Sequence, residues 1–88
     1  MTAGTAAIEQ QLRTSLEAQA VEVVDESALH AGHAGARGGG HYAVTVVSPQ
    51  FSGRSPVERH RMIYAALGDA MRSQIHALGI HAFSPEEL

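Results

Sequence analysis

The sequence predicts a small α+β domain in which a three-stranded sheet is packed by helices on one face. Short segments rich in β-branched residues stand between segments whose apolar residues recur every three to four positions. Their order along the chain is helix, strand, strand, helix, strand and short helix, with a second helix possible after the main one. The 88 residues suffice for one modest core, so we expect a single domain spanning 1–88.

The first half of the chain predicts a helix followed by a β-hairpin. Ile8, Leu12 and Leu16 recur every four residues, which is typical of a helix with a narrow apolar stripe, and we place this helix at 5–19. Valine-rich residues 20–25 and the segment 41–48 (HYAVTVVS) have the composition of strands. Residues 28–40 contain five glycines and no apolar periodicity, so we expect a loop there that joins the two strands.

The second half begins with a turn at 49–54, in which Phe51 is expected to pack onto the core. The run Ser55-Pro56-Val57-Glu58 is a capping box with proline at the first helical position, so a helix begins there. Its apolar positions continue beyond Gly68, where a glycine costs roughly 1 kcal/mol relative to alanine. We therefore expect a kink or a break into two helices at Gly68.

The end of the chain predicts a third strand and a terminal turn of helix. Residues 75–82 are apolar at both alternating positions, which is expected of a strand covered on both sides. Residues 84–87 repeat the capping-box pattern and predict a short helix. Arg59 lies within the apolar arc of the main helix, so its charge needs a carboxylate, and we expect this to be Asp25 or Glu26.

Composition excludes several classes of function. The net charge of −3 and pI of about 6.0 give no general basic field for nucleic acid. Without cysteine, the chain cannot form a disulfide, a thiol nucleophile or a thiolate metal site by itself. Neither a signal peptide nor a membrane span is apparent, so we expect a cytoplasmic protein. No nucleophile motif, phosphate loop or carboxylate pair stands out, which argues against an enzyme.

The chemistry-bearing residues are six histidines, at positions 30, 33, 41, 60, 76 and 81. Structural zinc sites generally need four ligands, usually with thiolates, so zinc is disfavoured. His60 and His81 lie inside regular elements and are expected to be packing or surface residues, and His41 is expected at the sheet edge. Histidines can replace two thiolates of an iron–sulfur cluster, so this chain could supply imidazoles while a second molecule supplies sulfur.

One chained set of motifs resembles the BolA family of small iron–sulfur-linked and regulatory proteins. The central motif has Phe51, Gly53, Ser55-Pro56 and the run Arg59 to Tyr64 (RHRMIY), and Ile75 to Leu78 (IHAL) follows it. The likeness extends upstream through Asp25-Glu26-Ser27, the region of His30 and His41 to Ser48, and downstream to Ser84 to Glu87. It therefore covers nearly the whole chain.

This resemblance implies a class II KH-like fold and a partner. BolA-like proteins pair with monothiol glutaredoxins and share a [2Fe–2S] cluster, for which the glutaredoxin and glutathione give the sulfur ligands. The BolA-like protein gives one residue between the first two strands and the histidine of the IHAL motif. Carried over to this sequence, these are His30 and His76, with His33 as the alternate loop ligand. Alone, the chain is expected to hold no cofactor and to be a monomer or weak homodimer.

The alternative is a DNA-binding transcriptional regulator, because some BolA relatives are described as such and KH-like folds often bind nucleic acid. Arg54, Arg59 and Arg61 cluster at the start of the main helix, whose free amides could hold a phosphate. However, Gly53-Arg54-Ser55-Pro56 lacks the G-x-x-G loop with which KH domains hold a nucleic-acid backbone. Fold analogy alone does not carry this alternative.

Overall fold

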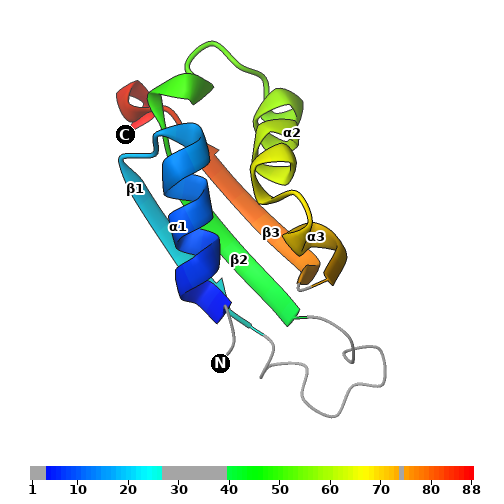
Figure 1. Cartoon of the computed structure of the whole chain (residues 1–88). Helices are drawn as coiled ribbons and strands as arrows, with labels where there is room; N and C mark the ends of the chain where they lie inside the picture. The colour runs from blue at the N-terminus through cyan, green and yellow to red at the C-terminus, as the bar shows by residue number, and fades with distance from the viewer. Residues whose placement is uncertain (1–3, 27–39, 74) are drawn as a thin grey trace.

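The computed structural model describes residues 4–26, 40–73 and 75–88. The elements follow the predicted order (Figure 1). Their bounds are α1 Gly4–Leu16, β1 Ala20–Asp25, β2 Gly40–Val47, η3 Pro49–Phe51, α2 Pro56–Leu67, α3 Ala70–Ser73, β3 Ile75–Phe83 and η4 Pro85–Glu87. The α+β class predicted from the sequence is confirmed.

The sheet has the order β1-β2-β3, with β2 in the centre. β1 pairs antiparallel with β2, which confirms the predicted hairpin, and β3 pairs parallel with β2. The register of β2 and β3 shifts between Gly40 and His41, whose partners are Ile75 and Ala77. His76 is therefore the residue of β3 that the register skips, as in a β-bulge.

All three α-helices lie on one face of the sheet, and the core fills the space between them (Figure 1). Val44 and Val46 of β2 are fully buried against apolar side chains of α1 and α2. The buried helix residues are Ile8, Leu12, Leu16, Ile63 and Leu67. The helices on one face, expected from the sequence, are thus confirmed.

The expectation that residues 75–82 are covered on both sides is wrong. Leu78, Ile80 and Ala82 of β3 pack toward the helices. The alternate residues Gly79 and His81 are exposed on the opposite face. The apolar composition of this segment predicts cover on both sides only if its small residues are core positions, whereas here they face water.

Gly68 separates α2 from α3, which confirms the predicted break. Its φ of 51° and ψ of −121° lie in a region that only glycine adopts readily. Its N–H donates to Tyr64 O at 3.0 Å, which closes the last turn of α2. The apolar pattern that predicted one long helix therefore continues beyond Gly68 in a separate short helix, α3.

α1 ends at Leu16, three residues earlier than the predicted boundary. Glu17 has a positive φ of 52° and turns the chain toward β1. Ser48, fully buried after β2, donates its hydroxyl to Leu16 O at 2.6 Å. A carbonyl at the end of α1 is thus satisfied by a residue far away in the sequence, which local pattern cannot reveal.

None of the helices in the described part of the chain is long and apolar enough to cross a membrane.

Candidate functional site

The two described segments that end at Glu26 and begin at Gly40 lie side by side at one end of the sheet. Glu26, just after β1, donates its N–H to His41 O at 2.7 Å. Gly40, where β2 begins, pairs with Ile75 at the start of β3. Positions 26 and 40, which flank residues 27–39 in the sequence, are therefore neighbours beside the backbone of His76. We call this end of the sheet, formed by Glu26, Gly40, His41 and the backbone of residues 75–77, the histidine end.

The two loop histidines of the prediction, His30 and His33, lie outside the described residues. Chain length nevertheless limits their reach. His30 is four residues from Glu26, a span of at most about 14 Å. Strands are about 4.8 Å apart, so two spacings separate β1 from β3 by about 10 Å. The geometry of the histidine end is thus compatible with a site that joins residue 30 or 33 to His76.

The backbone position of His76 has a physical reason to be special. A bulge changes the direction in which a strand presents a side chain, and bulges recur beside functional sites. Here the shift occurs at the first residues of β2 and β3, next to the position where residues 27–39 join the sheet. The structure therefore places the backbone of one predicted ligand at the start of β3, beside this register shift.

The described residues contain no cluster of potential metal ligands. Within 4–26, 40–73 and 75–88, no three His, Asp or Glu side chains come close enough to hold a metal ion. His60 is exposed on α2 and His81 is exposed on β3, which confirms that both are surface residues. His41 is half-buried on the central strand rather than at the sheet edge, so its predicted place is wrong.

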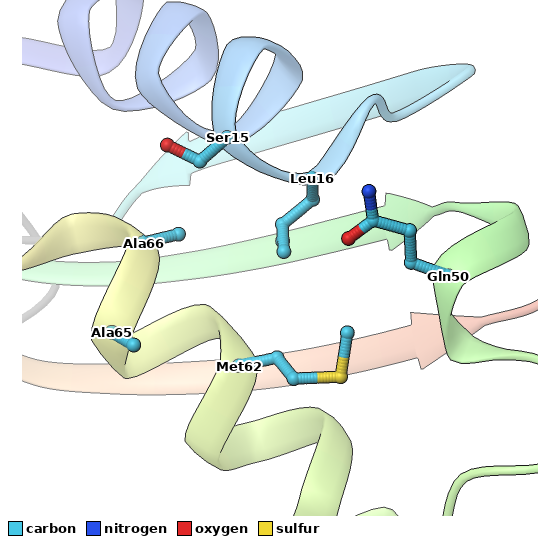
Figure 2. A pocket seen from close by; sticks show the side chains of 6 residues that line it. All are labelled: Ser15, Leu16, Gln50, Met62, Ala65 and Ala66. Atoms are coloured by element: carbon cyan, nitrogen blue, oxygen red, sulfur yellow. The ribbon is translucent and has the colours of Figure 1, made fainter.

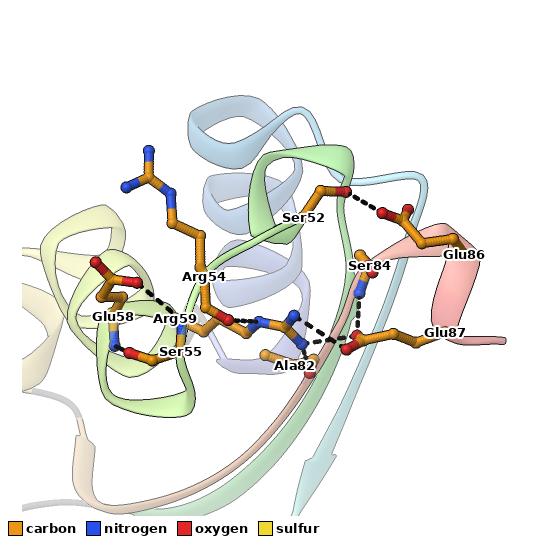
Figure 3. Close-up of polar contacts among 9 residues, drawn as sticks. All are labelled: Ser52, Arg54, Ser55, Glu58, Arg59, Ala82, Ser84, Glu86 and Glu87. Atoms are coloured by element: carbon orange, nitrogen blue, oxygen red, sulfur yellow. Dashed lines mark hydrogen bonds and ion pairs between the residues drawn. The ribbon is translucent and has the colours of Figure 1, made fainter.

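Arg59 has a structural role that the sequence indicated only in part. Its guanidinium donates to Arg54 O and Ala82 O, both at 3.0 Å, and makes two bonds to the Glu87 carboxylate, at 2.7 and 3.1 Å (Figure 3). Its side chain is 11% exposed. The guanidinium carbon also lies 5.9 Å from the centre of the Phe51 ring.

The expected partner of Arg59, Asp25 or Glu26, is wrong: the carboxylate comes from Glu87. β3 runs parallel to β2, so its last residues reach the start of α2. Asp25 and Glu26 stand at the other end of the sheet, where β2 begins. The need for a carboxylate followed from the sequence, whereas its identity depends on strand direction.

Hydrogen bonds set the charge state of this cluster. The hydrogen bonds from Arg59 and, second, from the backbone N–H of Ser84 together lower the pKa of Glu87 to about 2. Glu87 in turn raises the pKa of Arg59. The pKa of Glu58 is lowered mainly by the backbone N–H of Ser55.

The start of α2 offers less to a phosphate than the sequence suggested. The Glu58 N–H donates to the Ser55 hydroxyl at 3.1 Å, and the Ser55 N–H donates to Glu58 Oε1 at 2.8 Å, so the predicted capping box is confirmed. A carboxylate already occupies this helix start. Of the three arginines predicted as nucleic-acid contacts, Arg54 and Arg61 are exposed, whereas Arg59 is engaged within the chain.

A shallow groove between α1 and α2 was not predicted from the sequence (Figure 2). Its volume is about 360 Å³, and Ser15, Leu16, Gln50, Met62, Ala65 and Ala66 line it. It opens near the end of α1, away from the histidine end. No ionisable side chain lines it, so it offers neither acid–base nor metal chemistry.

Fold and site together define a small α+β protein that lacks thiols and carries its histidine end at the start of two parallel strands. Residues 12–87 match the model of the BolA-like protein family. The chain belongs to the BolA family.

Relatives of known sequence support this assignment. The chain is 39% identical over 80 residues to the DNA-binding transcriptional regulator BolA of Escherichia coli (strain K12), a match that covers 91% of this chain and 74% of that protein. It is 41% identical over 87 residues to SufE-like protein 1, chloroplastic/mitochondrial, of Arabidopsis thaliana. That match covers 92% of this chain but 24% of the relative, so the chain spans about a quarter of that protein.

Solved structures have the same fold. The BolA domain of SufE1 from Arabidopsis thaliana matches with a TM-score of 0.85 at 39% identity, covering 100% of this chain and 99% of that one. BolA1 from Arabidopsis thaliana matches with a TM-score of 0.84 at 32% identity, covering 100% and 98%. The arrangement of helices and sheet is therefore that of BolA domains.

Proposed function

We propose that this BolA-family protein is a non-enzymatic partner of a monothiol glutaredoxin in [2Fe–2S] cluster assembly, trafficking or iron sensing, and that it acts in the cytoplasm. Its part is to lend His76 and His30, or His33 in place of His30, as ligands to a cluster whose sulfur ligands come from the glutaredoxin and glutathione. The observation that carries the proposal is the histidine end, where His76 of β3 stands beside both chain positions that flank residues 27–39.

The donor set fits this role. The chain has no cysteine, so its strongest ligands for iron are imidazoles. Two imidazoles on one iron, with thiolates on the other, is an established arrangement for [2Fe–2S] clusters. Because an imidazole must be deprotonated to bind metal, the mixed complex should be lost in acid.

The experiment is reconstitution of the mixed complex under anaerobic conditions with a monothiol glutaredoxin, glutathione, ferric iron and sulfide. We expect His76→Ala to abolish or remodel the visible absorption and circular dichroism of the complex. His60→Ala is the matched control, because His60 is exposed on α2 and should leave the spectrum unchanged. An unchanged spectrum for His76→Ala would contradict the proposal.

The same measurement distinguishes the two loop histidines. If His30 is the ligand, His30→Ala should change the spectrum and His33→Ala should not. The reverse result would assign the site to His33. If both single variants keep the spectrum of the native complex and the double variant does too, the ligand set proposed here is wrong.

Transcriptional regulation is the second candidate, favoured by the name of the Escherichia coli relative. Arg54 and Arg61 are its candidate contacts, since both are exposed near the start of α2. A promoter fragment should then be retarded at moderate salt, and Arg54→Ala or Arg61→Ala should weaken its binding. Arg13→Ala on α1 is the control, and equal binding by all three variants would argue against this surface.

A further inference from the structure

On the sheet face opposite the helices, residues of β1 and β3 that lie in the same row are complementary in charge or in size. The register aligns Glu22 of β1, Thr45 of β2 and His81 of β3 in one row across the sheet. The next row is Val24, Ala43 and Gly79. We call these six residues the open face, because no helix of the described chain covers them (Figure 1).

In each row the two outer residues complement each other. Glu22 is an exposed acid and His81 is an exposed base. Val24 is an apolar side chain that is 45% exposed, and Gly79 has no side chain at all. A neighbouring row is also complementary in size, with the small Ala20 on β1 and the large Phe83 on β3.

The symmetry of a dimer would bring these complements together. A two-fold axis parallel to β2, lying above the open face, places β1 of one copy over β3 of the other. Glu22 of each copy then meets His81 of its mate, and Val24 meets the space at Gly79. Both contacts occur twice, and Thr45 lies next to the axis.

We propose that the open face is a self-complementary surface on which two copies of this chain pack sheet to sheet. The central residues Ala43, Thr45 and Gly79 are small, so two such faces can approach closely. Three short strands present less than the roughly 800 Å² per partner of a standard interface, so the dimer is weak. This proposal is independent of cluster binding.

Charge reversal provides the first test, by sedimentation velocity over a range of concentrations near pH 6. Glu22→Arg and His81→Glu should each raise the dissociation constant of the dimer by about fivefold or more, because each places like charges together twice. The double variant should return the constant toward the native value. Failure of the double variant to recover, with both singles folded, would overturn the pairing.

Gly79→Gln provides a steric test. A Cβ at Gly79 would have its nearest neighbour, Ala43 Cβ, at 3.9 Å, which is ordinary contact, so the monomer should fold. The added side chain occupies the space required by Val24 of the second copy, and dimerisation should be lost. Val57→Gln on α2, a position 58% exposed, is the control and should leave it unchanged.

Because the chain has no cysteine, a single introduced thiol reports the axis directly. Thr45→Cys should be joined to its symmetry mate by a short bismaleimide linker, whereas the matched variant Thr14→Cys on α1 should not. A native protein that stays monomeric up to about millimolar concentration, where a weak interface of this kind should be populated, would overturn the proposal. So would a dimer that all the open-face variants leave intact.

Discussion

Arg59 joins three segments that are distant in the sequence. Its guanidinium binds carbonyls at Arg54 and Ala82 and the carboxylate of Glu87, so the turn before α2, the end of β3 and η4 share one cation. Arginine suits this position because its planar group donates in several fixed directions, which lysine cannot do. The charge is largely withdrawn from water while the carboxylate stays partly exposed.

We expect Arg59→Ala to lower the midpoint of thermal unfolding more than Glu87→Gln does. Loss of the arginine leaves three acceptors without their donor, whereas the glutamine variant keeps the cation and both carbonyl bonds. Arg59→Lys should fall between them. Differential scanning calorimetry measures the order, with Arg61→Ala, an exposed neighbour, as the control.

The pKa of Glu87 predicts a pH dependence of the free energy of unfolding. Its folded value of about 2 lies below the ordinary value of 4.5, so its ionised form favours the folded state. This contribution is complete above pH 4.5 and is lost as the pH falls toward 2. The stability difference between the native protein and Glu87→Gln should therefore shrink across that window in urea titrations, and a constant difference would contradict it.

Helix ends are held by specific conformations and distant partners. Gly68 breaks the apolar pattern into α2 and α3 through a backbone conformation that other residues adopt only with strain. Ser48 holds the end of α1 from the end of β2. At the element scale, these two residues decide where helices stop.

Gly68→Ala should reduce the free energy of unfolding by about 1 kcal/mol or more, because alanine adopts its backbone angles with strain. No contact below 3.9 Å would form, so the loss would reflect conformation rather than collision. Gly79→Ala is the matched control, because its Cβ also has room and its φ is not positive. Equal losses in urea unfolding for both variants would refute the conformational explanation.

Ser48→Ala should reduce the free energy of unfolding by about 1–3 kcal/mol, since it leaves the carbonyl of Leu16 without its buried donor. It also removes the acceptor of the Gln50 N–H at 3.1 Å. Ser15→Ala, at an exposed position of α1, should change stability by less than about 0.5 kcal/mol. Chemical denaturation of the two variants gives the comparison.

At the scale of the whole molecule, the absence of thiols predicts dependence on a partner. The chain alone, mixed with ferric iron and sulfide, should retain no visible charge-transfer absorption after desalting. The absorption should appear when a monothiol glutaredoxin and glutathione are added. Retention of a cluster by the chain alone would show that the glutaredoxin and glutathione are not needed as ligands, which would contradict the proposal.

The elements and their order could be predicted from the sequence because local signals are strong: the Ser55 capping box, Gly68 and the valine-rich strands each act over a few residues. The partner of Arg59 and the uncovered face of β3 could not, since both depend on strand direction and pairing. At the histidine end, His76 could be predicted from the sequence as a candidate ligand. Its neighbours Glu26 and Gly40 could not, because they depend on the register of the strands.

The bond between Glu26 N–H and His41 O closes the sheet before residue 27 and after residue 39. Backbone pairing therefore joins the two strands directly at the base of the intervening thirteen residues, and the entropy of closing such a loop changes slowly with its length. Segments of other length, or with other metal-ligating residues, could therefore replace residues 27–39 between Glu26 and Gly40 while the sheet stays the same. Ligand chemistry at this end could then diversify without the rest of the protein having to change.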